Sequence, residues 1–336
     1  MIIEEIEIAG EVSQLQIPAR HPQMMPELTL KETFYPYGFP TVVWTNAFEI
    51  LTQCRESWGA FNKMFDTEPI RIEVHVEDSD STECPPALRY RIMPPLMIAV
   101  ADENNYIVND ISQGRTQIVI SRAVLQHKPY LQYFFIDGMA TCHIGARYTK
   151  GIHAACVALD ERGVLLCGDT GAGKSTLAYA CARAGWTYVT DDLSLLRNGE
   201  SNRMVLGNCH QVRLRPSATE LFPELEGLEI TPRADGKPSI ELSIASQTHI
   251  RRSPAARVDF IVFLNRRQGG PPELVPYRKD LARWFMREQG VHASEELLAL
   301  RTAAIEELLT VKIMELRYTD LDWAVERLKA LVREGR

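Results

Sequence analysis

The segment that most constrains this chain is Gly168-Asp169-Thr170-Gly171-Ala172-Gly173-Lys174-Ser175, which matches the pattern GxxxxGK[ST] in full. A phosphate-binding loop of this kind must join a strand to a helix. The apolar run Val164–Cys167 predicts the strand, and Thr176–Ala184 predicts a helix that ends at Gly185, where glycine best tolerates a left-handed conformation. The sequence therefore predicts an α/β core with this loop at the carboxyl end of a buried strand.

The residue types in the loop indicate which ligand it holds. Its glycines let backbone N–H groups converge on phosphate oxygens, and the positive end of the following helix dipole adds to the attraction. Lys174 is expected to neutralise the β- and γ-phosphates, and the Ser175 hydroxyl to ligate Mg2+. We therefore expect Mg-ATP as the ligand, bound by residues 168–176 with Thr176 included; the motif does not distinguish ATP from GTP.

A second polar element, Asp191-Asp192, comes directly after the predicted strand Trp186–Thr190. In α/β sheets, ligands bind at the carboxyl ends of the strands. We expect this strand to adjoin the strand before the loop, so that its two carboxylates reach the phosphates. Mg2+ coordination and proton abstraction are the tasks that carboxylates perform at that place.

The run Gly-Asp-Thr-Gly-Ala-Gly-Lys-Ser-Thr at 168–176, the helix end Arg183-Ala184-Gly185 and the segment Tyr188-Val189-Thr190-Asp191-Asp192 together resemble the catalytic domain of HPr kinase/phosphorylase. That family shares its P-loop core with ATP-dependent phosphoenolpyruvate carboxykinase. The resemblance covers about residues 145–265 and is most specific over 153–192.

The resemblance implies a role for each polar residue of the site. Asp192 would be the general base, while Asp191 and Ser175 would hold Mg2+. Lys174 and Arg257 would balance the charge that develops during phosphoryl transfer.

Two of these assignments follow from the family's spacing. His153 stands fifteen residues before Gly168, at the offset of the family's catalytic histidine. Arg257 precedes the apolar run Val258–Leu264 and corresponds to a functional arginine that stands just before a late buried strand.

The sequence also departs from the family pattern. The family has a glutamate directly after the P-loop serine, where this chain has Thr176. It also has a metal-binding glutamate inside a glycine-containing signature, and the corresponding region Asn208–Pro216 contains His210, Arg213 and Arg215 instead. Neither HPr as the substrate nor phosphorylase activity is therefore implied. Divergent relatives include kinases that tailor lasso-type peptides.

The chain is expected to have two domains. Residues 1–122 are predicted to form a smaller β-rich domain that helps to shape the acceptor site, with Arg71–Glu77 alternating as a half-buried strand does. Residues 123–336 are predicted to form the P-loop kinase domain of the HPr kinase C-terminal type. Its last two helices are expected at Glu295–Leu309 and Asp320–Val332.

Shorter elements are expected between them. Residues 125–148 are predicted to be helical in part, and Val258–Leu264 has the continuous apolar character of a strand in the middle of a sheet. Asn198-Gly199 predicts a tight hairpin between Leu193–Leu196 and Met204–Leu206.

Composition excludes several classes of protein. A net charge of −7 argues against a broad nucleic-acid interface. Tyr130–Ile144 is too polar to span a membrane, and Met1–Ile6 is acidic where a secretory signal is basic. Seven cysteines without a CxxC pair indicate reduced thiols in a cytoplasmic protein and argue against a zinc site.

The sequence thus predicts an ATP-dependent kinase that transfers the γ-phosphoryl group to a hydroxyl of a protein, peptide or small-molecule acceptor. Two alternatives stay open. One is a regulatory switch that binds or hydrolyses ATP, and the other is carboxykinase-like phosphoryl transfer to a small carboxylic acid, favoured by His210, Arg213 and Arg215. The acceptor and the oligomeric state are not fixed by the sequence, although the resembled family forms homo-oligomers, namely hexamers.

Overall fold

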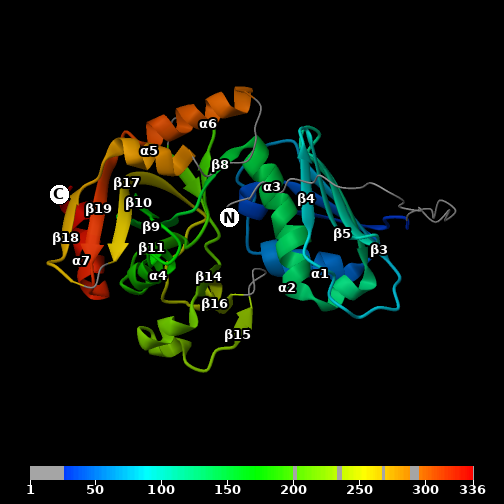
Figure 1. Cartoon of the computed structure of the whole chain (residues 1–336), viewed down its shortest axis with the longest axis horizontal. Helices are drawn as coiled ribbons and strands as arrows, with labels where there is room; N and C mark the ends of the chain where they lie inside the picture. Colours follow the sequence, from blue (N-terminus) through cyan, green and yellow to red (C-terminus); the bar gives the residue numbers. More distant parts are fainter. Residues whose placement is uncertain (1–25, 200–202, 233–236, 267–268, 288–294, 336) are drawn as a thin grey trace, which may run out of the picture.

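The computed structural model describes residues 26–199, 203–232, 237–266, 269–287 and 295–335. Met1–Ile6, predicted not to begin a secretory signal, lies outside these residues. The chain forms two lobes, each with a mixed sheet and helices packed on it (Figure 1). The predicted α/β class is therefore confirmed. No helix in the described part of the chain is long and apolar enough to cross a membrane.

The described part of the N-terminal lobe is built on a seven-stranded sheet. Its strands are β1 (Leu30–Phe34), β2 (Thr41–Thr45), β3 (Ile70–Glu77), β4 (Arg89–Met93), β5 (Leu96–Asp102), β6 (Asn105–Asp110) and β7 (Arg115–Ser121), in the order β1-β2-β3-β7-β6-β5-β4. Strands β2, β3 and β7 are parallel, and the other neighbours pair antiparallel. The predicted alternation is confirmed, because Ile72, Val74 and Val76 are all buried.

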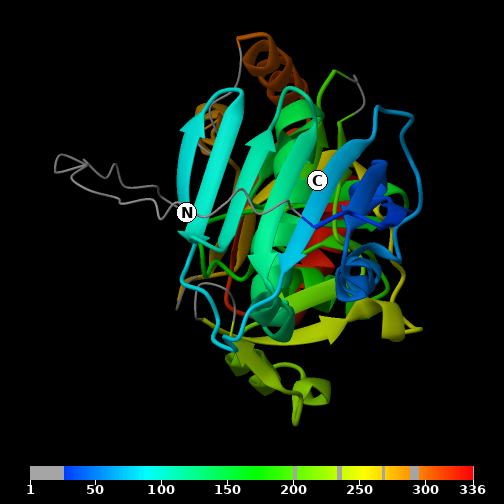
Figure 2. The ribbon, with the colours of Figure 1, turned by 90° about the vertical axis from the view of Figure 1, so that its right-hand side faces the viewer.

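A helical layer covers one face of this sheet. Helix α1 (Phe48–Trp58) connects β2 to β3, and α2 (Lys128–Tyr130), the π-helix η3 (Leu131–Asp137) and α3 (Gly138–Arg147) follow one another after β7. The expectation of a partly helical segment at 125–148 is thus confirmed. Figure 2 shows the opposite face of the sheet with the helices behind it. This helical segment packs in the apolar cluster of the N-terminal lobe; the boundary at 122/123 stays a prediction.

The second lobe is built on a nine-stranded sheet among the described residues. Its strands are β8 (Thr149–Ile152), β9 (Ala155–Leu159), β10 (Arg162–Cys167), β11 (Thr187–Thr190), β12 (Ser194–Arg197), β13 (Met204–Leu206), β17 (Ala255–Arg266), β18 (Glu273–Pro276) and β19 (Lys312–Tyr318). A separate small sheet has the order β14 (Gln211–Leu214), β16 (Pro238–Ser243) and β15 (Ile230–Pro232).

Strand β17 is the centre of the large sheet, as the apolar run at 258–264 predicted. It pairs in parallel with β10 on one side and with β19 on the other, and its first residues pair with β13. Strand β11 does not adjoin β10, contrary to the expectation, because β9 lies between them and pairs antiparallel with both. Because β9 is antiparallel to both of its neighbours, β11 and β10 run in the same direction. The carboxyl ends of β10, β11, β17 and β19 therefore share one edge of the sheet.

Helices cover both faces of this sheet (Figure 1). Helices α4 (Lys174–Arg183) and α7 (Leu321–Glu334) pack in one apolar cluster, and α5 (Lys279–Arg287) and α6 (Glu295–Leu308) in the cluster on the other face. The predicted helices α4, α6 and α7 are confirmed within a residue or two. The helix α5 and the strand β19 were not predicted.

The predicted hairpin is present but its turn is longer. Strands β12 and β13 pair antiparallel, with Leu195 opposite Leu206. Residues 198–203 separate the two strands, so Asn198-Gly199 is not a two-residue turn.

One apolar cluster extends across both lobes. Leu195 of β12 and Leu206 of β13 belong to the same cluster as Phe39, Ile72 and Ile144 of the N-terminal lobe. The lobes are therefore joined by packing and not only by the chain.

Candidate active site

The loop between β10 and α4 has the backbone conformation that its glycines permit. Gly168, Gly171 and Gly173 have φ angles of 146°, 89° and 96°, a region that residues with a Cβ rarely adopt. Asp169, Thr170 and Ala172 complete the turn, and the Ala172 N–H donates to the Asp169 carbonyl at 3.1 Å. Helix α4 begins directly at Lys174, so the positive end of its dipole faces the loop.

Lys174 lies folded across this loop. Its Nζ donates to the carbonyls of Gly168 at 2.7 Å and Asp169 at 3.1 Å, and the residue is only 6% exposed. Burial lowers the pKa of Lys174, while the nearby charge of Asp192 acts in the opposite direction. The loop thus holds an ammonium group at its centre, where a phosphate group would be neutralised.

Asp191 is a buried carboxylate beside the start of α4. Its Oδ1 accepts from the Tyr188 hydroxyl at 2.9 Å and its Oδ2 from the Arg213 backbone N–H at 3.3 Å, while the Ser175 hydroxyl donates to its backbone carbonyl at 3.4 Å. The pKa of Asp191 is raised to about 6, first by burial and then by the charge of Asp192. Ser175 and Asp191, predicted from separate segments, are therefore neighbours.

Asp192 has a different environment. It pairs with His153, whose Nδ1 lies 3.0 Å from Asp192 Oδ1, and the two side chains are 58% and 44% exposed. His153 follows the end of β8 and Asp192 follows β11. The structure therefore brings together two residues that the sequence placed in separate segments, and leaves both open to solvent.

Arg257 is not brought to this place. Val258, which follows it, pairs with Gly163 near the start of β10, whereas Cys167, next to the loop, pairs with Phe263. Arg257 thus stands at the amino end of β17, opposite the edge that holds the loop. Its guanidinium is 62% exposed and lies 3.9 Å from Asp259. A charge-balancing role at the phosphates does not fit this position, because Arg257 and the phosphate-binding loop stand at opposite ends of the paired strands β17 and β10.

Two other arginines lie near the loop instead. A Cβ placed on Gly171 would stand 3.9 Å from Arg215 Nη2. Arg266, at the carboxyl end of β17, pairs in register with Tyr318 of β19, whose hydroxyl would stand 3.1 Å from a Cβ on Gly173. In the sequence, Arg215 is one of three basic residues in the segment 208–216, and no motif points to Arg266.

The N-terminal lobe reaches the same region. Phe61 and His210 meet edge to face with ring centroids 4.6 Å apart. Asp137, at the end of the π-helix, accepts from Trp58 Nε1 at 2.8 Å, and the Arg213 guanidinium is close enough to lower its pKa against the larger effect of burial. The segment after β13, which carries His210 and Arg213, thus lies between the two lobes.

The chain has little detectable similarity to known proteins. No protein-family model matches the chain, and no curated protein matches its sequence. Among solved structures, the HPr(Ser) kinase/phosphatase from Coxiella burnetii is similar, with 13% sequence identity and a TM-score of 0.32 over 55% of this chain and 95% of that chain. Similarity at this level does not show membership of a family, and the function rests on the residues of this chain.

Proposed function

We propose that this chain is a Mg2+-dependent kinase that transfers the γ-phosphoryl group of ATP to a hydroxyl group. The observation that carries the proposal is the exposed His153–Asp192 pair, which stands at the same sheet edge as the loop that holds Lys174. Phosphoryl transfer needs positioning and charge stabilisation more than covalent chemistry. A loop for the phosphates and a base beside it meet that need.

The donor atoms next to the loop suit Mg2+. Ser175 Oγ and the Asp191 carboxylate are both oxygen donors, the type of ligand that Mg2+ prefers, and they lie on adjoining segments. Among the described residues, no group of three or more His, Cys, Asp or Glu side chains is arranged so that it could hold a metal ion. Such a site would therefore depend on the phosphates as well, and Mg2+ bound there would neutralise charge on them.

The roles of the protein residues follow from their environments. Asp192 is exposed and held by His153, so it is placed to accept the proton of an incoming hydroxyl. Asp191 is buried, and its carboxylate accepts hydrogen bonds from the Tyr188 hydroxyl and the Arg213 backbone N–H. A carboxylate held in this way suits a metal ligand whose position is fixed. Lys174 would exchange its loop carbonyls for phosphate oxygens.

The acceptor would enter between the lobes. Asp192 is exposed at the sheet edge, and the segment with His210 and Arg213 joins this edge to Phe61 and Asp137. This supports a contribution of the N-terminal lobe to the acceptor site. It favours transfer to an organic hydroxyl over a switch that only hydrolyses ATP.

The proposal is tested with [γ-32P]ATP, Mg2+ and the full chain, incubated with fractionated peptide and metabolite pools. We expect label in an organic product with wild type and its loss with Asp192→Asn. Release of labelled inorganic phosphate at the same rate with and without each pool would show instead that water is the acceptor.

A further inference from the structure

Two uncommon backbone conformations lie next to each other in the N-terminal lobe. Tyr37, in the short helix η1 (Pro36–Gly38), has φ of 50° and ψ of 24°, a left-handed conformation that is rare for a bulky residue. The π-helix η3 ends at Asp137, and π-helical turns are rare and frequent at functional sites. The Thr141 side chain, one helical turn beyond Asp137, is a hydrogen-bond partner of the Tyr37 hydroxyl. Because backbone strain clusters at ligand sites, the pair Tyr37 and Asp137 is a candidate for ligand contact.

Tyr37 and Asp137 stand at the edge of the N-terminal lobe that faces the other lobe. Both residues are half-buried. The Tyr37 ring packs on Phe61 with centroids 5.4 Å apart, and Phe61 in turn contacts the segment that carries Arg213. Burial and then the Asp137 carboxylate raise the pKa of Tyr37, with a smaller effect of Asp192 in the same direction and of Arg213 against it. The Tyr37 hydroxyl therefore lies near the proposed base, although it belongs to the other lobe.

Asp137 is a carboxylate whose hydrogen bonds come from neutral groups. Its Oδ1 accepts from Trp58 Nε1 at 2.8 Å and its Oδ2 from Gln132 Nε2 at 3.0 Å. Burial raises the pKa of Asp137, and these two donors act against that effect by favouring the ionised form. Within the part of the chain that the structure describes, no ion pair involves Asp137, and the nearby Arg213 is paired with Glu241 at 2.8 Å. A half-buried carboxylate of this kind is stabilised by a cation that comes from outside the protein.

We propose that the acceptor carries a protonated amino group in addition to its hydroxyl, and that Asp137 binds this group next to the Tyr37 hydroxyl. The inference rests on the proposed function and names the chemical class of its acceptor. The acceptor hydroxyl would lie at Asp192 and its amino group at Asp137, so that one molecule bridges the two lobes. In the transfer, the acceptor oxygen bonds to the γ-phosphorus, ADP leaves and the hydroxyl proton passes to Asp192. The amino group takes no part in these bond changes.

The surroundings disfavour the other polar groups that an acceptor could carry at this position. A carboxylate or phosphate group would be repelled by both Asp137 and Asp192. A neutral hydroxyl could donate to Asp137 but would leave its charge without a counter-ion. The rings of Tyr37 and Phe61 add aromatic surface, which attracts a cation.

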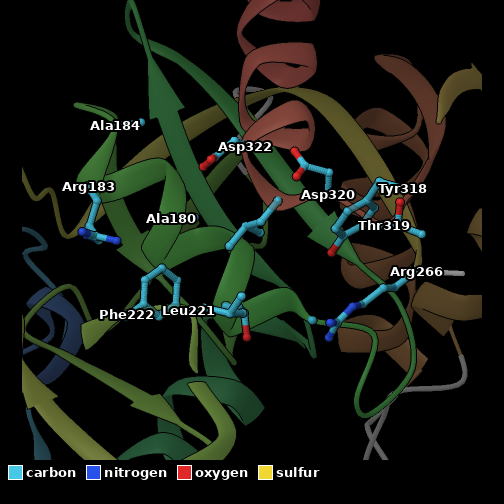
Figure 3. Close-up of a pocket in the computed structure, with 13 residues that line it drawn as sticks. Ala180, Arg183, Ala184, Leu221, Phe222, Arg266, Tyr318, Thr319, Asp320 and Asp322 are labelled. Atoms are coloured by element: carbon cyan, nitrogen blue, oxygen red, sulfur yellow. The ribbon is translucent and has the colours of Figure 1, made fainter. Parts of the chain in front are cut away.

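A cavity of about 470 Å3 beside the phosphate-binding loop has a different position. Its lining residues include Gly173, Thr176 and Arg266, and its walls come from α4, the end of β17 and the β19–α7 turn (Figure 3). Helix α7 lies at the end of the molecule away from the N-terminal lobe (Figure 1). The place of the amino group, between the lobes, is therefore separate from this cavity.

The test uses the full chain with Mg2+, ATP labelled with 32P at the γ-phosphate, and a pool of metabolites and peptides. Cation exchange in acid divides the pool into compounds retained through an amino group and compounds that pass through. A hydrogen bond between charged groups strengthens binding by about tenfold or more, so we expect labelling of organic product at least about tenfold faster with the retained fraction. Acetylation of the primary amino groups in that fraction should remove the difference, because an amide is not charged.

Variants then test Asp137 itself. Asp137→Asn should raise the amount of retained fraction needed for half-maximal labelling by at least about tenfold and change the maximal rate less, because Asp137 binds the acceptor and does not react. Tyr37→Phe removes one hydroxyl and should raise this amount by a smaller factor, so it serves if Asp137→Asn does not fold. Asp78→Asn is the matched control, since it removes a carboxylate of the same lobe that is 96% exposed, and it should behave as wild type.

Three results would overturn the amino-group site and leave the kinase proposal intact. They are faster labelling with the compounds that pass through, undiminished labelling after acetylation, and equal requirements for wild type, Asp137→Asn and Tyr37→Phe. The proposed function fails in a different way. In that case neither fraction gives a labelled organic product with wild type, and the inference fails with it.

Discussion

Asp191 and Asp192 are adjacent in sequence but their side chains have opposite surroundings. Asp191 is 7% exposed and accepts from Tyr188, whereas the Asp192 side chain is 58% exposed and pairs with His153. The strand β11 ends at Thr190, so the two carboxylates diverge as the chain leaves the sheet. This difference in burial predicts that the two residues act at separate steps.

Replacing each aspartate should separate binding from transfer. Asp192→Asn should bind Mg-ATP nearly as well as wild type and lose turnover by roughly 10²–10⁴-fold, the usual contribution of a positioned base. Asp191→Asn should instead raise the Mg2+ concentration needed for half-maximal turnover. A Mg2+ titration of turnover distinguishes them. Rescue of Asp192→Asn, but not of Asp191→Asn, by excess Mg2+ would reverse the two roles.

Ligand binding should stabilise the protein through Lys174. A ligand that binds only the native state adds about 2.7 kcal/mol of stability at a concentration of about 100 times Kd. The melting temperature of wild type should therefore rise as Mg-ATP is added, and that of Lys174→Ala should not. Absence of any rise for wild type with millimolar Mg-ATP and Mg-GTP would contradict the nucleotide site itself.

The raised pKa of Asp191 predicts how stability changes with pH. The pKa in the folded chain is about 6 against 3.8 for the free side chain, so the folded state holds the proton more tightly. The stability that this carboxyl contributes is therefore complete below the unfolded pKa and is lost as pH rises through about 6. Urea unfolding without ligand should show Asp191→Asn gaining stability relative to wild type between pH 5 and pH 8. A difference that stays constant over this range would contradict the assigned pKa.

The Tyr188 hydroxyl should tune this ionisation. It donates to Asp191 Oδ1 and favours the ionised form, so Tyr188→Phe should raise the pKa of Asp191 further. The pH below which Mg2+-dependent binding of ATP weakens should then move upward. Tyr179→Phe is the matched control, because that buried tyrosine donates to Glu224 at 3.0 Å. Equal pH profiles for the two variants would show that the Tyr188 hydrogen bond has no such effect.

HPr is not expected to be the acceptor. In the HPr kinase family that the sequence resembles, a glutamate stands where this chain has Thr176. The segment 208–216 of this chain also lacks the signature that the resembled family has in the corresponding region. Incubation with HPr, ATP and Mg2+ should leave the intact mass of HPr unchanged. Stoichiometric addition of one phosphoryl group would show that these departures do not determine the acceptor.

The loop and its helix could be predicted because their requirements are local. Glycines with positive φ, a lysine and a hydroxyl at fixed spacing are all read from one short segment. The neighbours of β11 could not be read in this way, since the position of β9 between β11 and β10 depends on pairing across the sheet.

Which arginine of β17 lies near the phosphate-binding loop could not be predicted from the sequence either. Arg257 and Arg266 stand at opposite ends of one strand, and only the direction of β17 relative to β10 decides which end reaches the loop. Arg266 meets the site through its pairing with Tyr318, a residue far along the chain in a strand that the sequence did not reveal.

The apolar cluster that contains Leu195, Leu206 and Ile144 has a consequence for unfolding. Removing residues before Tyr148 would expose the apolar side chains that β12 and β13 direct towards the N-terminal lobe. The apolar interior of the N-terminal lobe is thus completed by side chains of the other lobe. The molecule should melt in a single calorimetric transition, and movement between the lobes during turnover should be limited to rearrangement around this shared interior.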